Sequence, residues 1–104
     1  MSSLLLVYTD SLTGPYHFTA PTKGVFARAF FEDHDGSGGG PGVALQPDEV
    51  REVVLAELRD LEMRIGTERD PGWAHYLQKH HVRPLRRLLR SLKVSQLVRL
   101  EWLI

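Results

Sequence analysis

The chain has 104 residues, no cysteine, and 13 basic and 13 acidic residues, so its formal net charge is zero. A chain of this length forms one domain around a single core, and we expect residues 1–104 to fold as one unit. The lack of cysteine excludes disulfide bonds and thiolate metal sites, and it favours a reducing setting.

The N-terminal part predicts two β-strands. Residues 4–9 are apolar on both faces, which indicates an interior strand, and turn-forming residues follow it. Residues 16–19 predict the second strand. The apolar run at residues 4–7 is too short to span a membrane, and no basic residue precedes it as in a signal peptide. We therefore expect a cytoplasmic protein.

Residues 25–33 predict a third strand. The odd-numbered positions 25, 27, 29 and 31 are all apolar and should meet the helices. Phe26 and Phe30 fall on the opposite face of this strand, together with charged residues. If both rings are exposed on that sheet face, they mark an interface, for example with a second copy of the chain.

A glycine-rich segment at residues 36–42 predicts a flexible loop. A phosphate-binding role would need a Lys-Ser/Thr pair after the glycines, which this segment lacks. Asp33, Asp35 and Gly36 match three positions of a calcium-binding loop, but Phe31 and Gly42 stand where that loop needs carboxylates. We therefore interpret the segment as a connection and expect no bound cofactor.

The best-defined predicted helix covers residues 47–65. Pro47 suits the first helical position, and Gly66 suits the position after the last. One stripe is apolar and should face the core; it consists of Val50, Val53, Val54, Leu58, Leu61 and Ile65. The other side is charged and should be solvated; it consists of Arg51, Glu52, Glu57, Arg59, Asp60, Glu62 and Arg64.

A further helical segment begins at Asp70 and Pro71, with an apolar side formed by Trp73, Tyr76, Leu77 and His80 or His81. Pro84 lacks the backbone N–H and clashes with a preceding carbonyl in a regular helix. Two outcomes remain open: a kink near His81, or a new helix that begins at Pro84.

The C-terminal third is a basic amphipathic helix followed by a strand. The helix has an apolar stripe at Leu85, Leu88, Leu89 and Leu92. Residues 95–104 then alternate, with Val98, Leu100, Trp102 and Ile104 on one face. The whole pattern predicts a two-layer α+β fold, in which one mainly antiparallel four-stranded sheet, in element order β-β-β-α-α-β, carries its helices on one face.

The charges are segregated along the chain. Residues 47–72 carry four basic and eight acidic groups, whereas residues 73–104 carry seven basic and one acidic. The candidate partner-binding residues are therefore Arg83, Arg86, Arg87, Arg90 and Lys93, with Phe26 and Phe30 on the sheet. The alternative is that the acidic and basic helices lie side by side and neutralise each other.

Catalytic and metal sites are not predicted. His75, His80 and His81 lack the i, i+4 spacing that brings two ligands together on a helix. A triad cannot be assembled from His34, Asp35 and Ser37 within four residues. No other nucleophile is flanked by a motif for its activation, so we expect a protein that is not an enzyme.

These observations favour a small non-catalytic protein-binding module, acting as a regulator, adaptor or inhibitor of an immunity type, with a homodimer as one form of partner. The alternative is a nucleic-acid-binding module that uses the basic helix at residues 83–93. A third hypothesis is a metal-dependent enzyme that uses histidine and aspartate.

Overall fold

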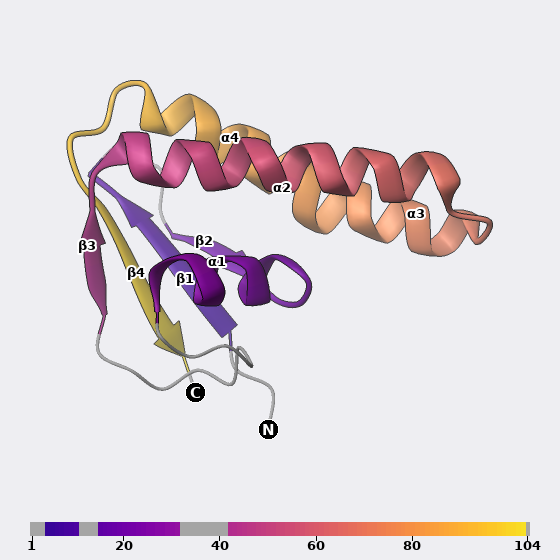
Figure 1. Cartoon of the computed structure of the whole chain (residues 1–104), viewed down its shortest axis with the longest axis horizontal. Coiled ribbons are helices and arrows are strands. Elements are labelled where there is room, and N and C mark those ends of the chain that lie inside the picture. Colours follow the sequence, from indigo (N-terminus) through magenta and orange to yellow (C-terminus); the bar gives the residue numbers. More distant parts are fainter. Residues whose placement is uncertain (1–3, 11–14, 32–41, 104) are drawn as a thin grey trace.

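The chain forms an α+β structure in which a layer of helices covers one face of a four-stranded antiparallel sheet (Figure 1). The computed structural model describes residues 4–10, 15–31 and 42–103. The sheet order is β2-β1-β4-β3, with β1 (Leu4–Thr9), β2 (Tyr16–Phe18), β3 (Val43–Leu45) and β4 (Val98–Leu103). This confirms the predicted class, the antiparallel sheet and the return of the C-terminal strand to the first.

Alternating apolar residues build the sheet face that meets the helices. The register pairs Leu5 with Trp102, and cross-strand partners point to the same face. The fully buried residues of the two central strands are Leu5, Val7, Val98 and Leu100. The predicted apolar face of the last strand is thus confirmed at its first two positions, and Trp102 is half-buried against the core. Ile104 lies outside the described residues.

Two antiparallel helical rods form most of the second layer. The first is α2 (Pro47–Thr67), and the second joins α3 (Pro71–Leu77), a π-helical turn (Gln78–Val82) and α4 (Arg83–Leu92). Figure 1 shows that α3 and the adjoining end of α2 extend beyond the sheet. The buried stripe of α2 confirms its prediction, since Val50, Val54, Leu58 and Leu61 are all in the core.

Pro84 neither kinks the second rod sharply nor starts a separate helix. The backbone remains helical through Val82 and Arg83. The N–H of Arg83 donates to the carbonyl of Gln78, five residues earlier, as in a π-helix. The wider turn relieves the contact between the proline ring and the preceding carbonyl groups. The local insertion of one π-turn therefore keeps α3 and α4 in one rod.

The predicted third strand is wrong, because most of residues 25–33 belong to a helix. α1 (Thr22–Phe30) buries Phe26, whose ring lies 5.9 Å from that of Phe18 in β2. This segment is apolar at so many positions that both strand and helix periods fit it, and packing against the core decides. The third strand is instead β3, only three residues long. Residues 32–41, including most of the predicted glycine-rich loop 36–42, lie outside the described residues.

Candidate partner-binding site

The basic face of α4 comprises Arg83, Arg86, Arg87, Arg90 and Lys93, and all five residues are exposed. The opposite side of the helix carries the predicted leucine stripe. Leu85, Leu88 and Leu92 are buried, and Leu89 packs against the core. Because these leucines fix the helix on the sheet layer, the cations project from a backbone that is held in place.

Only one residue of the basic face is neutralised by the acidic helix within the described part of the chain. Arg86 Nη2 lies 2.6 Å from Glu62 Oε1 on α2. Both side chains are more than half exposed, so this pair contributes about 0.2–1 kcal/mol. Among the described residues, Arg83, Arg87, Arg90 and Lys93 form no ion pair. The neutralisation hypothesis therefore holds for one cation of the five.

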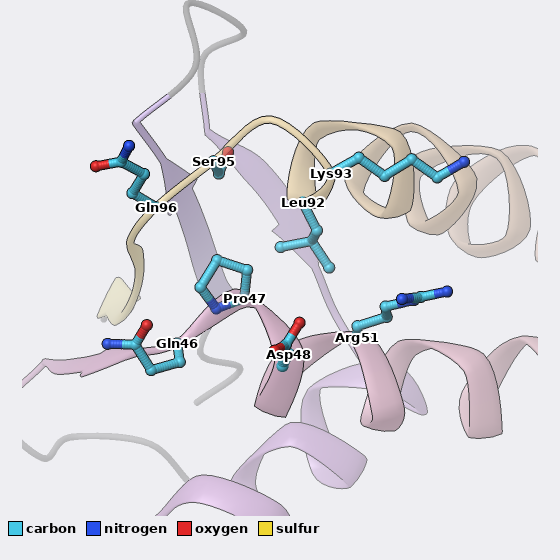
Figure 2. Close-up of a pocket in the computed structure, with 8 residues that line it drawn as sticks. All are labelled: Gln46, Pro47, Asp48, Arg51, Leu92, Lys93, Ser95 and Gln96. Carbon is cyan, nitrogen blue, oxygen red and sulfur yellow. The ribbon is translucent and has the colours of Figure 1, made fainter.

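A groove of about 490 Å³ lies where the basic face ends, between the C-terminus of α4 and the N-terminus of α2. Figure 2 shows the Lys93 and Arg51 side chains extending in the same direction from the two helices, with Asp48 beside the base of Arg51. Leu92 and Pro47 supply apolar lining. The groove therefore offers two cations beside a small apolar surface, with one carboxylate among them.

Hydrogen bonds fix the loop that forms one wall of this groove. The Ser95 hydroxyl donates to the carbonyl of Ser91 at 2.7 Å. The Gln96 N–H donates to the Asp10 carboxylate at 3.0 Å, and this bond lowers the pKa of Asp10. The loop is thus tied both to α4 and to the end of β1.

Phe26 and Phe30 do not form an exposed aromatic sheet face, so this part of the predicted site is wrong. Phe26 is fully buried, and Phe30 is half-buried beside it with its ring 6.2 Å away. The reason is that both residues lie on α1 at i, i+4 spacing and point to the core. On the outer sheet face, Arg99 instead lies over the ring of Tyr8 at 4.8 Å.

An exposed aromatic ladder on the second rod was not predicted. It consists of Trp73, Tyr76 and His80, with ring centroids 5.2 Å and 4.7 Å apart along the ladder. Trp73 is 45% exposed and Tyr76 is 37% exposed. The sequence indicated that these residues face the core, but only Leu77 and His81 of that predicted side are buried. The spacing of three and four residues between these rings can be read from the sequence. Whether this side of the helix faces the core or the solvent cannot.

His81 is buried where the π-turn meets the start of α1. Its Nδ1 lies 2.9 Å from the hydroxyl of Thr22, which is also buried. Its Nε2 has no hydrogen-bond partner within the described residues. Burial lowers the pKa of His81, with a smaller contribution from the neighbouring His80. The Thr22–His81 pair therefore links α1 to the second rod.

Glu57 is buried, although the sequence placed it on the solvated side of α2. It is 2% exposed, and its Oε2 has no hydrogen-bond partner among the described residues. Burial raises its pKa to about 7, and Arg64 and Arg28 oppose this shift. Position 57 lies three residues after Val54 and four before Leu61, so the helical period alone already pointed it toward the core.

Metal coordination has no support in the described part of the chain. There, no three histidine, aspartate or glutamate side chains gather where they could hold an ion. His34, with Asp33 and Asp35, lies outside the described residues. The groove beside Lys93 is lined by one carboxylate and no histidine.

No protein-family model, curated protein or solved structure matches the chain. Among the described helices, none combines the length and apolar character needed to cross a membrane. The candidate site is therefore defined by its geometry alone.

Proposed function

We propose that the chain is a non-catalytic binding module that docks onto an acidic protein surface through the basic face of α4, and so acts as a regulator, adaptor or inhibitor. One observation carries this proposal. Four cations of that face lack an ion pair within the described residues, although the acidic helix α2 packs alongside. Charge that the described residues do not neutralise is available to carboxylates of a partner.

The placement of these cations suits recognition of carboxylates. Arginine presents a planar set of donors that matches a carboxylate in two parallel hydrogen bonds. A helix fixed by a buried stripe holds the spacing between successive arginines, which reduces the entropy lost on binding. Such a face raises the association rate and sets the orientation of the partner.

The groove at the end of the basic face extends this surface. Lys93 belongs to both the face and the groove, and Arg51 adds a second cation from α2. Asp48 opposes them, so the groove favours a partner that brings one acidic side chain flanked by apolar groups over one that brings many negative charges. The groove thereby adds shape complementarity to a docking surface whose other recognition feature is positive charge.

A nucleic-acid backbone is the second candidate partner, because the same unpaired arginines also suit phosphate groups. The two candidates differ in their response to salt. Release of counterions from a nucleic acid makes affinity fall steeply with salt concentration. A protein interface depends on salt less steeply, because part of its affinity comes from buried apolar surface.

The test is affinity purification of the tagged chain from its host lysate, with and without nuclease, followed by measurement of the affinity for the purified partner. The variant Arg87→Glu with Arg90→Glu reverses two unpaired cations of the basic face. The control, Arg59→Glu with Arg69→Glu, changes net charge equally at exposed positions outside that face. Thermal unfolding of each variant checks that it folds.

The expected result is a protein partner that survives nuclease and binds the Arg87/Arg90 variant at least about tenfold more weakly, with little change in the control. If the proteins that co-purify with the chain are lost after nuclease treatment, the basic face would be assigned to nucleic-acid binding. Equal binding by both double variants would show that this face is not the docking surface.

A further inference from the structure

The aromatic ladder occupies the part of the helical layer that extends beyond the sheet (Figure 1). Trp73 and Tyr76 are the large aromatic side chains that remain most exposed among the described residues. Rows of exposed rings on a projecting helix are typical of binding surfaces, because covering them with a partner removes apolar area from water.

Positive charge flanks the ladder on the same rod. Lys79 and Arg83 follow Tyr76 by three and seven residues on the same rod, and both side chains are exposed. Neither forms an ion pair within the described residues. From residue 71 to residue 100 the sequence contains no aspartate or glutamate. Asp70 lies three residues before Trp73, so a partner that covers the ladder meets the two cations at its C-terminal end, where an acidic group is favoured.

The geometry of the rings favours a peptide over stacked bases. Trp73 lies one turn before Tyr76 and nearly parallel to it, at 9°, and His80 lies one turn after it. Trp73 thus covers one face of Tyr76 by parallel stacking, and the tilted His80 ring contacts Tyr76 from the following turn. Single-stranded nucleic acids bind through open ring faces, whereas ring edges carry partial positive charge and suit carboxylates and aliphatic groups.

We infer that the Trp73–Tyr76–His80 ladder, with Lys79 and Arg83, is the docking strip for an acidic protein segment that carries large apolar side chains. The inference rests on the proposed function and specifies which element of the partner is recognised. The apolar side chains would lie along the ladder, and the carboxylates would meet the two cations. The basic face of α4 would then guide the rest of the partner.

The test uses a fluorescein-labelled peptide of about 12 residues that alternates glutamate with leucine and phenylalanine, followed by fluorescence anisotropy. A peptide with serine in place of the apolar residues, and a labelled oligothymidine strand, are the comparison probes. Trp73→Ala and Lys79→Glu alter the strip. Met63→Ala is the matched control, because Met63 is 68% exposed on α2 and lies outside the strip.

A second readout guards against misfolded variants. In the Trp102→Phe background Trp73 is the remaining tryptophan, since the chain has two. Its emission should shift to shorter wavelength when the peptide covers it. This measurement keeps the aromatic strip intact and reports directly on its burial.

The inference predicts that Trp73→Ala and Lys79→Glu each weaken binding of the apolar acidic peptide at least about fivefold, and that Met63→Ala changes it less than about twofold. The serine peptide should bind correspondingly more weakly to the unaltered chain. Unchanged affinity in Trp73→Ala, or an unshifted Trp73 emission at saturation, would overturn the inference.

Three outcomes separate the inference from related possibilities. Binding that depends on Arg87 and Arg90 but not on Trp73 would leave the proposed function standing and reject the strip. Oligothymidine that binds more tightly than the peptide and requires Trp73 would assign the strip to nucleic acid. A dimer in sedimentation velocity that Trp73→Ala dissociates would assign it to a second copy of the chain.

Discussion

Replacement of Glu57 by glutamine should remove a pH dependence from the stability of the fold. Burial raises the pKa of Glu57 from 4.5 to about 7, so the folded state holds a proton that the unfolded state has released between these values. The folded state then binds more protons than the unfolded state, and the free energy of unfolding falls as pH rises from about 4.5 to 7. Glutamine keeps the shape of the side chain and cannot titrate.

The size of the effect follows from the two pKa values. A difference between 4.5 and about 7 corresponds to about 3.4 kcal/mol, at about 1.4 kcal/mol for each factor of ten. Relaxation of the fold and entry of water around the charged carboxylate reduce this difference. We therefore expect wild type to lose about 2 kcal/mol relative to Glu57→Gln across this pH range.

The assay is urea unfolding, followed by circular dichroism, of wild type and Glu57→Gln from about pH 4.5 to 8. The lowered pKa of His81 acts in the opposite direction, since its contribution is lost as pH falls below 6.5, but it is common to both proteins and cancels in their difference. Glu52→Gln, at an exposed position of the same helix, is the control and should track wild type. Parallel pH profiles for wild type and Glu57→Gln would refute the reasoning.

Three further predictions concern stability and can be checked by the same unfolding measurement. Thr22→Val should cost about 1–3 kcal/mol, because it leaves the buried Nδ1 of His81 without its partner at 2.9 Å; a smaller loss would mean that water replaces the hydroxyl. Arg86→Ala should cost less than about 1 kcal/mol, because the pair with Glu62 is exposed. Leu88→Ala should cost about 2–5 kcal/mol, because its side chain is fully buried; a value near zero would place it at the surface.

The parts of the fold that the sequence predicts well are those with one clear period. α2 and α4 each combine an apolar stripe with a charged remainder, and β4 alternates between the buried Val98 and Leu100 and the exposed Arg99. In each case a single orientation removes the apolar residues from water. The buried sides of both helices could therefore be assigned from the sequence.

The prediction for α1 is wrong because its apolar residues fit both the two-residue period of a strand and the 3.6-residue period of a helix. The segment around Phe26 is apolar at adjacent positions, so alternation and helical spacing describe it equally well. The ring of Phe26 packs against Phe18 of β2, and Thr22 forms a hydrogen bond with His81, which is 59 residues away in the sequence. Tertiary packing decides whether the segment forms a strand or a helix, and this packing cannot be read from the local sequence pattern.

The candidate site was predicted in part for a similar reason. The cations from Arg83 to Lys93 were found because charged side chains on an amphipathic helix lie outside by default. For Trp73 and Tyr76 the sequence pattern predicts a place in the core, because large aromatic residues are usually buried. Their exposure follows from the side of the rod on which they lie, since Leu77 and His81 are the residues of this stretch that face the core.

The π-turn at Gln78–Val82 has a consequence for how the two halves of the second rod are oriented. A π-turn places one residue more in a turn than the α-helical spacing does, and each residue of an α-helix advances the chain by about 100° around the axis. The turn therefore acts as an angular offset between α3 and α4. The position of the aromatic rings around the axis of α3 therefore does not follow from the position of the buried leucines around the axis of α4 by the α-helical spacing alone. The angle between the aromatic side of α3 and the leucine side of α4 depends on the five residues of the π-turn, Gln78–Val82.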